Sequence, residues 1–470
     1  MDLKIIGATE EITGSRNYLK FQDGTEVLID FGLKQGNLRN LKQVMDYNAR
    51  DFEFEVENID YVIITHAHAD HLNALPHLIK MGFKGNVIMT EPTSEFAHIT
   101  LYDSAKIMES DVEWYKSNFK RELEPLYTKE DVDNTLPFLR CYDFNTVIHL
   151  SDKVSVELLV AGHMLGACMP KFTEVDKWGR ETSIVFTGDT SSFTYQKPFL
   201  PPSDALGSVD YVVTESTYGD RRHEKVDVEE ILTKNIKRVC KNGYTLIIPV
   251  FAMQRSSEII WMLREVYLKN PDFYRFPIYL DTPMGVKAQD VMDRNRDFWG
   301  KKWIERDDKL GNLFEWEMLH FIEDHQESLA LNNNHPKIIL SSSGMCNAGR
   351  ITMHLQNYLP NRGNMFLLTG YQAEDTVGRY LLEHGGNGGV TSVDGNKVDI
   401  RAYVDAFSFS SHADYLQLTE LLKSTEKGRL KKVFLNHGDE DSKIKFKKHL
   451  QRHLRGANIE IAEYNKIYEL

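Results

Sequence analysis

Four side chains of the kinds that bind metals stand within six residues of one another. They are His66, His68, Asp70 and His71, and they directly follow the apolar, β-branched run 61–65. In an extended chain His66 and His68 project to the same side, and a following turn would bring Asp70 and His71 to a neighbouring point. This one segment is therefore predicted to serve two metal ions, an arrangement typical of hydrolytic centres. The alternative is a polar loop with incidental imidazoles.

Two further candidate ligands lie downstream, in segments rich in small residues. His163 stands within AGHMLGA, and Asp189 stands within IVFTGDT. Small neighbours and glycines let a metal ion approach the backbone closely. Taken alone, each residue is more often a packed, hydrogen-bonded side chain than a ligand. Their order after the four-ligand segment favours ligation.

The elements that must position these residues follow an α/β pattern. Short β-rich runs end in polar or glycine-containing segments that carry the candidate residues. These runs are 26–31, 61–65, 183–189, 211–216 and 244–250. Apolar residues recur at helical spacing between the runs, for example in 228–240. Functional groups at strand ends are typical of α/β layer enzymes.

The length and charge of the chain limit its classes of function. A chain of 470 residues exceeds what one hydrophobic core usually supports, which predicts two domains or one domain with a large insertion. The net charge of −13 gives no global attraction for a polyanion. A nucleic acid would therefore need a local site where divalent cations reverse the sign of the charge.

No segment predicts a membrane protein or a secreted one. The first residues lack the basic segment and apolar core of a secretory signal, and the apolar stretch 244–253 is too short to span a bilayer. The four cysteines form no CxxC pair, which argues against a thiolate zinc site and a disulfide framework. We expect buried thiols in a soluble, intracellular, cytoplasmic protein that does not contact a membrane.

The ordered motifs resemble those of the metallo-β-lactamase superfamily. They are Asp30 at the end of the run 26–31, the segment 66–71, His163 and Asp189. The resemblance implies one metal ion held by His66, His68 and His163, a second held by Asp70 and His71, and Asp189 bridging the two. It also implies that Asp30 orients a ligand imidazole. The alternative for Asp30 is an ordinary aspartate at a strand end or turn.

Motifs in the second half resemble those of the β-CASP nucleases. Glu215 stands in 212–223, His412 in 407–415 and His437 in 433–440. The likeness covers nearly the whole chain and is greatest to RNA-processing members related to the nuclease subunit of the pre-mRNA 3′-end cleavage machinery and to their bacterial and archaeal homologues. In that family a histidine at the third motif marks enzymes acting on RNA, and this chain has His437 there. The resemblance also implies that His437 is a metal ligand. The chain departs from the family at Ser411, where alanine is usual, and at Asn436, where an aliphatic residue is usual.

The fold that the resemblance implies is an α/β fold, a metallo-β-lactamase αββα sandwich with an inserted β-CASP α/β domain. The sandwich would comprise residues 1–208 and 395–470, and the inserted domain residues 209–394. The glycine-containing segment 384–389 is the candidate return point between domains.

The activity that the resemblance implies is that of a metal-dependent ribonuclease, in which a hydroxide bridging two metal ions hydrolyses RNA by endonucleolytic or 5′ exonucleolytic attack. Two zinc ions are expected, with manganese or iron as alternatives, because imidazoles and carboxylates accept all three. The catalytic residues would be Asp70, His412, Glu215 and Asp30. His412, paired with Glu215, would stabilise the transition state or protonate the leaving oxygen.

Another set of residues would hold neighbouring phosphates through guanidinium and backbone N–H groups. This set is Ser343, Gly344, Arg350, Tyr371, Arg379 and Arg255. The alternative for an isolated arginine is a surface or packing role.

Two other functions remain open. A small-molecule metallohydrolase, such as a thioesterase or lactonase, would use the same metal ligands but would not need Glu215 and His412. A partner-dependent scaffold subunit would show degraded ligands, whereas every ligand position of this chain is intact. The expected partner is single-stranded RNA, and the resemblance suggests a homodimer.

Overall fold

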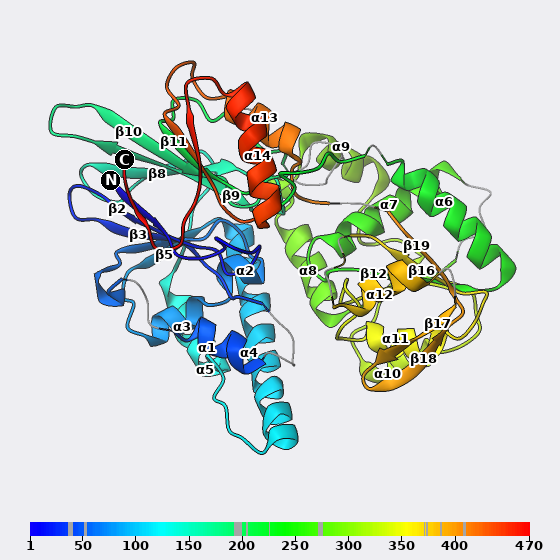
Figure 1. Cartoon of the computed structure of the whole chain (residues 1–470). Coiled ribbons are helices and arrows are strands. Elements are labelled where there is room, and N and C mark those ends of the chain that lie inside the picture. The colour runs from blue at the N-terminus through cyan, green and yellow to red at the C-terminus, as the bar shows by residue number, and fades with distance from the viewer. Residues whose placement is uncertain are drawn as a thin grey trace. The chain divides into compact units, whose positions relative to one another are not determined.

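The computed structural model describes residues 1–35, 41–50, 54–191, 200–203, 205–224, 226–270, 276–370, 372, 375–385, 388–407 and 410–470. They form two compact units, one made of Met1–Arg222 with Ser411–Leu470 and the other of His223–Ser410. Figure 1 shows the blue N-terminal and the red C-terminal segments within the same unit. Each unit is built around a sheet or sheets of its own.

Two seven-stranded sheets, counted over the described residues, form the first unit (Figure 1). The first has the order β22-β1-β2-β3-β4-β5-β6. Its strands are β1 (Asp2–Ile5), β2 (Arg16–Lys20), β3 (Glu26–Phe31), β4 (Tyr61–Ile63), β5 (Asn86–Met89), β6 (Leu139–Cys141) and β22 (Ile467–Glu469).

The second sheet has the order β21-β20-β11-β10-β9-β8-β7. Its strands are β7 (Val147–His149), β8 (Val154–Val160), β9 (Cys168–Val175), β10 (Glu181–Phe186), β11 (Tyr211–Thr214), β20 (Lys432–Leu435) and β21 (Asn458–Ile461). Ile29 and Ile63 of the first sheet join Phe172 and Phe434 of the second in one buried cluster. The predicted sandwich is therefore confirmed.

Parallel pairing brings the candidate residues to one end of each sheet. In the first sheet Ile29 lies opposite Ile63, and the chain then continues to Asp30 and to His66 respectively. In the second sheet β10, β11 and β20 run parallel, and they are followed by Asp189, Glu215 and His437. Because parallel strands end at the same edge, residues far apart in the sequence meet there.

Helices cover the outer faces of the sandwich, α1 to α5 beside the first sheet and α13 and α14 beside the second (Figure 1). The helices are α1 (Leu41–Asn48), α2 (Ala69–Leu72), α3 (Leu75–Lys80), α4 (Glu91–Phe119), α5 (Lys129–Thr135), α13 (Tyr415–Lys423) and α14 (Glu440–His453). Short 3-10 turns are η2 (Val56–Asn58) and η3 (Leu136–Phe138). The N-cap of α13 is Asp414, whose side chain accepts hydrogen bonds from Leu416 N and Gln417 N, so this sequence defines its own helix start.

The second unit contains a parallel sheet with the order β14-β13-β15-β12-β16-β19, and a separate hairpin β17–β18. The strands are β12 (Thr245–Pro249), β13 (Ile278–Asp281), β14 (Leu319–Phe321), β15 (Lys337–Ser341), β16 (Met365–Leu368), β17 (Gly389–Val393), β18 (Asn396–Ile400) and β19 (Tyr403–Ala406). Its helical segments are α6 (Val228–Val239), η4 (Cys240–Asn242), α7 (Arg255–Lys269), α8 (Pro283–Arg294), η5 (Arg296–Phe298), α9 (Lys301–Leu310), α10 (His325–Ala330), α11 (Ile351–Tyr358) and α12 (Val377–His384). Its core includes Ile247, Ile339, Leu355 and Phe366.

The boundaries of the inserted unit differ from the predicted range 209–394. The strand β11 pairs with β10 and β20, so it belongs to the sandwich rather than to the insertion. The strand β19 pairs with β16 and so belongs to the insertion. The glycine-containing segment 384–389 leads into the hairpin β17–β18 rather than back to the sandwich. Strand pairing over long sequence separations decides these boundaries, and local turn signals do not report it.

Two other expectations concern membranes and cysteines. Within the described part of the chain, no helix has the length and apolar character needed to cross a membrane. Cys141, Cys168 and Cys346 are free thiols. Cys168 and Cys346 are buried as expected, but Cys141 is exposed, because it ends the edge strand β6.

Candidate metal centre

The segment that carries the first four ligands changes from strand to helix within a few residues. The strand β4 ends at Ile63, and His68 has the extended backbone of a helix N-cap, with φ −70° and ψ 149°. The helix α2 then begins at Ala69, which places Asp70 and His71 in its single turn. The predicted extended start and following turn are therefore both present.

Three imidazoles form the first ligand cluster. His66 Nε2 lies 3.1 Å from His68 Nδ1, and His163 Nε2 lies 3.2 Å from the same atom. Ligands of a tetrahedral zinc ion, each at about 2.0–2.1 Å from the metal, lie about 3.3–3.4 Å apart. The rings of His66 and His163 are buried, so bulk water does not compete for these nitrogens. The donor set and its spacing fit one divalent cation.

The second ligand cluster combines two imidazoles with a carboxylate. His71 Nε2 lies 3.2 Å from His437 Nε2. The Oδ2 atom of Asp70 lies 3.7 Å from His71 Nε2 and 3.4 Å from His437 Nε2. The structure thus adds His437 to the pair that the sequence placed together locally.

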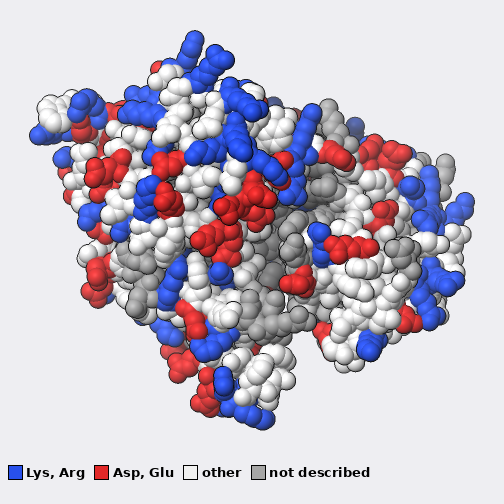
Figure 2. All heavy atoms as spheres, viewed as in Figure 1, with Lys and Arg blue, Asp and Glu red and all other residues white. Residues whose placement is uncertain are grey.

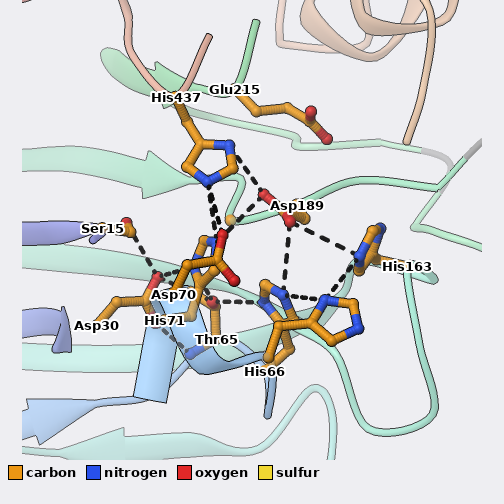
Figure 3. Close-up of polar contacts among 12 residues, drawn as sticks. Ser15, Asp30, Thr65, His66, Asp70, His71, His163, Asp189, Glu215 and His437 are labelled. Atoms are coloured by element: carbon orange, nitrogen blue, oxygen red, sulfur yellow. Dashed lines mark hydrogen bonds and ion pairs between the residues drawn. The ribbon is translucent and has the colours of Figure 1, made fainter. Parts of the chain in front are cut away.

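Asp189 lies between the two clusters, as Figure 3 shows. Its Oδ2 atom is 3.5 Å from His66 Nε2 and 3.6 Å from His163 Nε2. Its Oδ1 atom is 3.4 Å from His71 Nε2 and 3.4 Å from His437 Nδ1. Oδ1 is buried, and these two nitrogens lie farther from it than in an ordinary hydrogen bond. A buried carboxylate oxygen without a short hydrogen bond is costly, and a cation would satisfy it.

The backbone before Asp189 has room for glycine alone. Gly188 adopts φ +50°, and a Cβ atom there would meet the side chain of Thr65 at 2.8 Å. A larger residue would displace the Asp189 carboxylate from its place between the clusters. The small residue at this position thus makes room for Thr65, and not directly for a metal ion as the sequence suggested.

Burial sets the protonation of the first cluster. It lowers the pKa of His66 and His163 well below the ordinary value and that of His68 to about 4. These imidazoles are therefore neutral near pH 7, which is the form that binds metal. Burial alone would also lower the pKa of His71, but the carboxylates of Asp189 and others raise it well above its ordinary value. A bound cation would displace that proton.

Asp30 lies behind the second cluster and holds one of its ligands. Its Oδ2 atom is 2.7 Å from His71 Nδ1, and its Oδ1 atom accepts a hydrogen bond of 2.8 Å from the backbone N–H of Thr65. Thr65 Oγ1 also donates to Oδ2 at 3.0 Å, and Ser15 Oγ lies 3.5 Å from it. These contacts support the orienting role predicted for Asp30. The sequence reasoning missed Thr65 and Ser15, although Thr65 directly precedes His66.

His412 and Glu215 form a pair beside the first cluster. His412 Nδ1 lies 2.8 Å from Glu215 Oε2, and it lies 3.9 Å from Asp189 Oδ2. The other carboxylate oxygen, Glu215 Oε1, accepts a hydrogen bond of 2.6 Å from Thr190 N. Burial opposes the charge on His412, but Glu215 and Asp189 raise its pKa to about 9. The imidazole is therefore protonated and oriented in the metal-free chain.

The candidate phosphate-binding arginines lie in the second unit and have acidic partners there. Arg350 donates to Asp281 Oδ1 at 2.6 Å and to the carbonyl of Ile322 at 2.9 Å. Arg255 donates to Glu258 Oε2 at 2.7 Å. Arg379 donates to Glu383 Oε1 at 2.5 Å. A phosphate would have to compete with these carboxylates, so the arrangement of Arg350 in particular favours a packing role.

The remaining phosphate candidates lie in loops of the same unit. Ser343 Oγ accepts hydrogen bonds from the backbone N–H groups of Asn347 and Ala348, at 3.3 Å and 3.4 Å. Gly344 lies against Phe251, whose ring a Cβ atom would meet at 2.9 Å. Tyr371 lies outside the described residues. The phosphate role of this set stays a prediction.

Three family models match the chain. The metallo-β-lactamase superfamily matches residues 17–140, the β-CASP domain matches 256–381, and the Zn-dependent metallo-hydrolase RNA specificity domain matches 397–462. The three matches follow the order in which the sequence motifs suggested the domains.

Similar proteins cover nearly the whole chain. A ribonuclease of Thermus thermophilus is 30% identical over 464 residues, which are 98% of this chain and 98% of that protein. An RNase J-like protein of Methanocaldococcus jannaschii is 28% identical over 451 residues, or 94% of each chain. Cleavage and polyadenylation specificity factor 73 of Drosophila melanogaster is 29% identical over 481 residues, and this chain spans 64% of its length.

The buried histidine and aspartate clusters at the strand ends of a two-sheet sandwich define a metal-binding hydrolase of the α/β type. With its matching family models and its likeness to these relatives, the chain belongs to the β-CASP family of the metallo-β-lactamase superfamily. The family predicted from the sequence motifs is confirmed.

Proposed function

We propose that this chain is a ribonuclease that hydrolyses phosphodiester bonds of single-stranded RNA, in RNA processing or decay. The observation that carries the proposal is the Asp189 carboxylate, which lies 3.5 Å from His66 Nε2, 3.4 Å from His71 Nε2 and 3.9 Å from His412 Nδ1. A lactonase or thioesterase would use the clusters but would not need the His412–Glu215 pair. Relatives named ribonuclease and RNase J-like protein support an RNA substrate.

We propose two zinc ions as the resident metals, with manganese or iron as substitutes. His66, His68 and His163 would hold one ion, and Asp70, His71 and His437 the other. Asp189, which lies within 3.6 Å of nitrogens in both clusters, would be shared by the two ions. When bound, the ions would supply Lewis acidity and a water ionised near neutral pH. Two zinc ions carry a total charge of about +4, and the carboxylates of Asp70 and Asp189 would reduce it to about +2. This remaining positive charge would still attract a phosphodiester.

The surface charge makes such a local site necessary. Figure 2 shows acidic and basic side chains interspersed over the described residues of the face in view. The net charge of −13 also opposes long-range attraction of RNA. The substrate would therefore be held chiefly where the metal ligands gather.

His412 would act as the proton donor to the leaving oxygen. The carboxylate of Glu215 holds the ring through Nδ1, so Nε2 would carry the proton that is transferred. Glu215 itself is buried and bonded to Thr190 N, and it would act by orienting and charging His412. Asp30 would act in the same indirect way on His71.

The direct test uses single-stranded RNA, labelled at either end, with DNA of matching sequence as the control. Metal-replete protein is expected to cleave the RNA, and a chelator is expected to abolish cleavage. The product ladder distinguishes endonucleolytic from 5′ exonucleolytic attack. If fully metallated protein cleaves neither polymer, the ribonuclease proposal fails, and a small ester or thioester becomes the substrate to assay. Cytoplasmic location and a homodimer stay predictions from the sequence.

The Glu215→Gln variant is expected to move the alkaline fall in kcat to lower pH. Glu215 is the strongest of the groups that raise the pKa of His412 to about 9, although bound cations would lower that value. The protonated form of His412 disappears as the pH rises through this pKa, so a lower pKa brings the fall earlier. The pH dependence of kcat for RNA cleavage measures the shift. The control is Glu57→Gln, which changes an exposed glutamate and should leave the pH profile unchanged. A pH profile of Glu215→Gln that matches the wild type would contradict the proton-donor role of His412.

A further inference from the structure

The backbone of His437 is held in an uncommon conformation. Its φ is +48°, in the left-handed region that a residue with a side chain adopts only when its surroundings fix it. Its N–H donates to the carbonyl of Ala8 at 3.0 Å, and its carbonyl accepts from Ser216 N at 3.0 Å. These two bonds set the direction in which the imidazole points toward Asp70 and His71.

The loop that supplies the Ala8 carbonyl is held by three donors from the C-terminal segment. The carbonyl of Gly7 accepts from Asn436 Nδ2 at 3.1 Å, and that of Ala8 accepts from His437 N. The carbonyl of Thr9 accepts from Lys443 Nζ. The carbonyls of residues 7, 8 and 9 therefore accept hydrogen bonds from Asn436, His437 and Lys443 in turn.

Both outer donors are buried. Asn436 is 3% exposed and Lys443 is 2% exposed, so neither is an incidental surface contact. Burying an ammonium group is costly, and the burial lowers the pKa of Lys443 despite the neighbouring carboxylates of Glu440 and Asp439. An aliphatic side chain at position 436 could fill the space but could not donate to Gly7, whose carbonyl would lose this partner.

Asn436 is also fixed from the opposite side. Its N–H donates to the carbonyl of Thr214 at 3.0 Å, and its carbonyl accepts from Ser216 Oγ at 2.5 Å. The neighbouring Gly438 has no room for a Cβ atom, which would meet the Ser216 carbonyl at 2.6 Å. The side chain of Asn436 therefore joins the loop 7–9 to a backbone that Thr214 and Ser216 hold in place.

We propose that Asn436 and Lys443 are positioning residues for the ligand His437. By binding the loop 7–9 they hold the Ala8 carbonyl against His437 N, and this sets the affinity of the second cluster for its cation. The inference rests on the proposed two-metal centre. It concerns the cluster of Asp70, His71 and His437 and leaves the three-imidazole cluster unchanged.

The test is a titration of the metal-free full chain with Co²⁺, followed by its visible absorption. In Asn436→Leu the first equivalent is expected to bind as in the wild type, and the second about 10–100-fold more weakly, the usual effect of losing an outer partner of a ligand. Lys443→Met is expected to weaken the same step. In the metal-free Asn436→Leu chain, amide exchange of the peptide containing His437 is expected to be about 10-fold faster, because the bond to Ala8 opens more often.

A matched control is Asn364→Leu. Asn364 is also a buried asparagine, in the second unit, and its Nδ2 donates to the carbonyl of Tyr358 at 3.2 Å. It should lower the Tm as Asn436→Leu does but leave both Co²⁺ steps unchanged. Two unchanged Co²⁺ steps in Asn436→Leu would overturn the inference. A wild-type chain that binds one Co²⁺ would instead overturn the two-metal centre, and failure to cleave RNA would overturn only the proposed substrate.

Discussion

Replacing Asp189 with Asn is expected to cost most of the bound metal and at least about 10³-fold in the rate of RNA cleavage. The carboxylate lies between both clusters, with one oxygen 3.5 Å from His66 Nε2 and the other 3.4 Å from His71 Nε2. An amide keeps one oxygen, loses the charge and presents an N–H₂ group to the other cluster. Both ions therefore lose a ligand in one substitution.

The measurement is the metal content of the purified Asp189→Asn protein by elemental analysis, together with single-turnover cleavage. Asp152→Asn is the control, because Asp152 is an exposed aspartate of the same unit. Retention of two ions per chain, or a rate within about 10-fold of the wild type, would mean that Asp189 does not bridge.

Replacing His412 with Ala is expected to lower kcat by about 10²–10⁴ while the metal content stays that of the wild type. The Nδ1 atom of His412 bonds to Glu215 and lies 3.9 Å from Asp189 Oδ2, so the ring is close to the first cluster but is not one of its three imidazoles. Loss of the proton donor thus slows the chemical step without removing a metal ligand. The pair of results from Asp189→Asn and His412→Ala separates metal binding from proton transfer.

The His412→Ala variant also leaves the buried carboxylate of Glu215 without its imidazole partner, which lowers stability. The second variant, His412→Asn, keeps a hydrogen-bond donor for Glu215 but cannot transfer a proton near neutral pH. Its kcat should fall as far as that of His412→Ala while its Tm stays closer to the wild type. Full activity in either variant would rule out His412 as the proton donor.

The sequence by itself determined the part of the centre that is local. His66, His68, Asp70 and His71 lie on a strand end and one helical turn, so their mutual geometry follows from backbone conformations that six residues set. The resemblance carried by the motifs gave the family, the sandwich and the remaining ligand positions. Strand-end placement was predictable because each ligand follows an apolar run.

Tertiary structure decided the rest, because it depends on partners far apart in the chain. His71 meets His437 across 366 residues, and the boundaries of the inserted unit follow from the pairing of β11 and β19. The sequence predicts Arg350 to bind phosphate, but in the structure it donates to Asp281. The sequence shows Asn436 only as a departure from the family's aliphatic residue, whereas in the structure its amide donates to the carbonyl of Gly7. Periodicity and spacing report which face of an element is buried. They do not show which hydrogen-bond partner a buried side chain has, because that partner comes from a segment far away in the sequence.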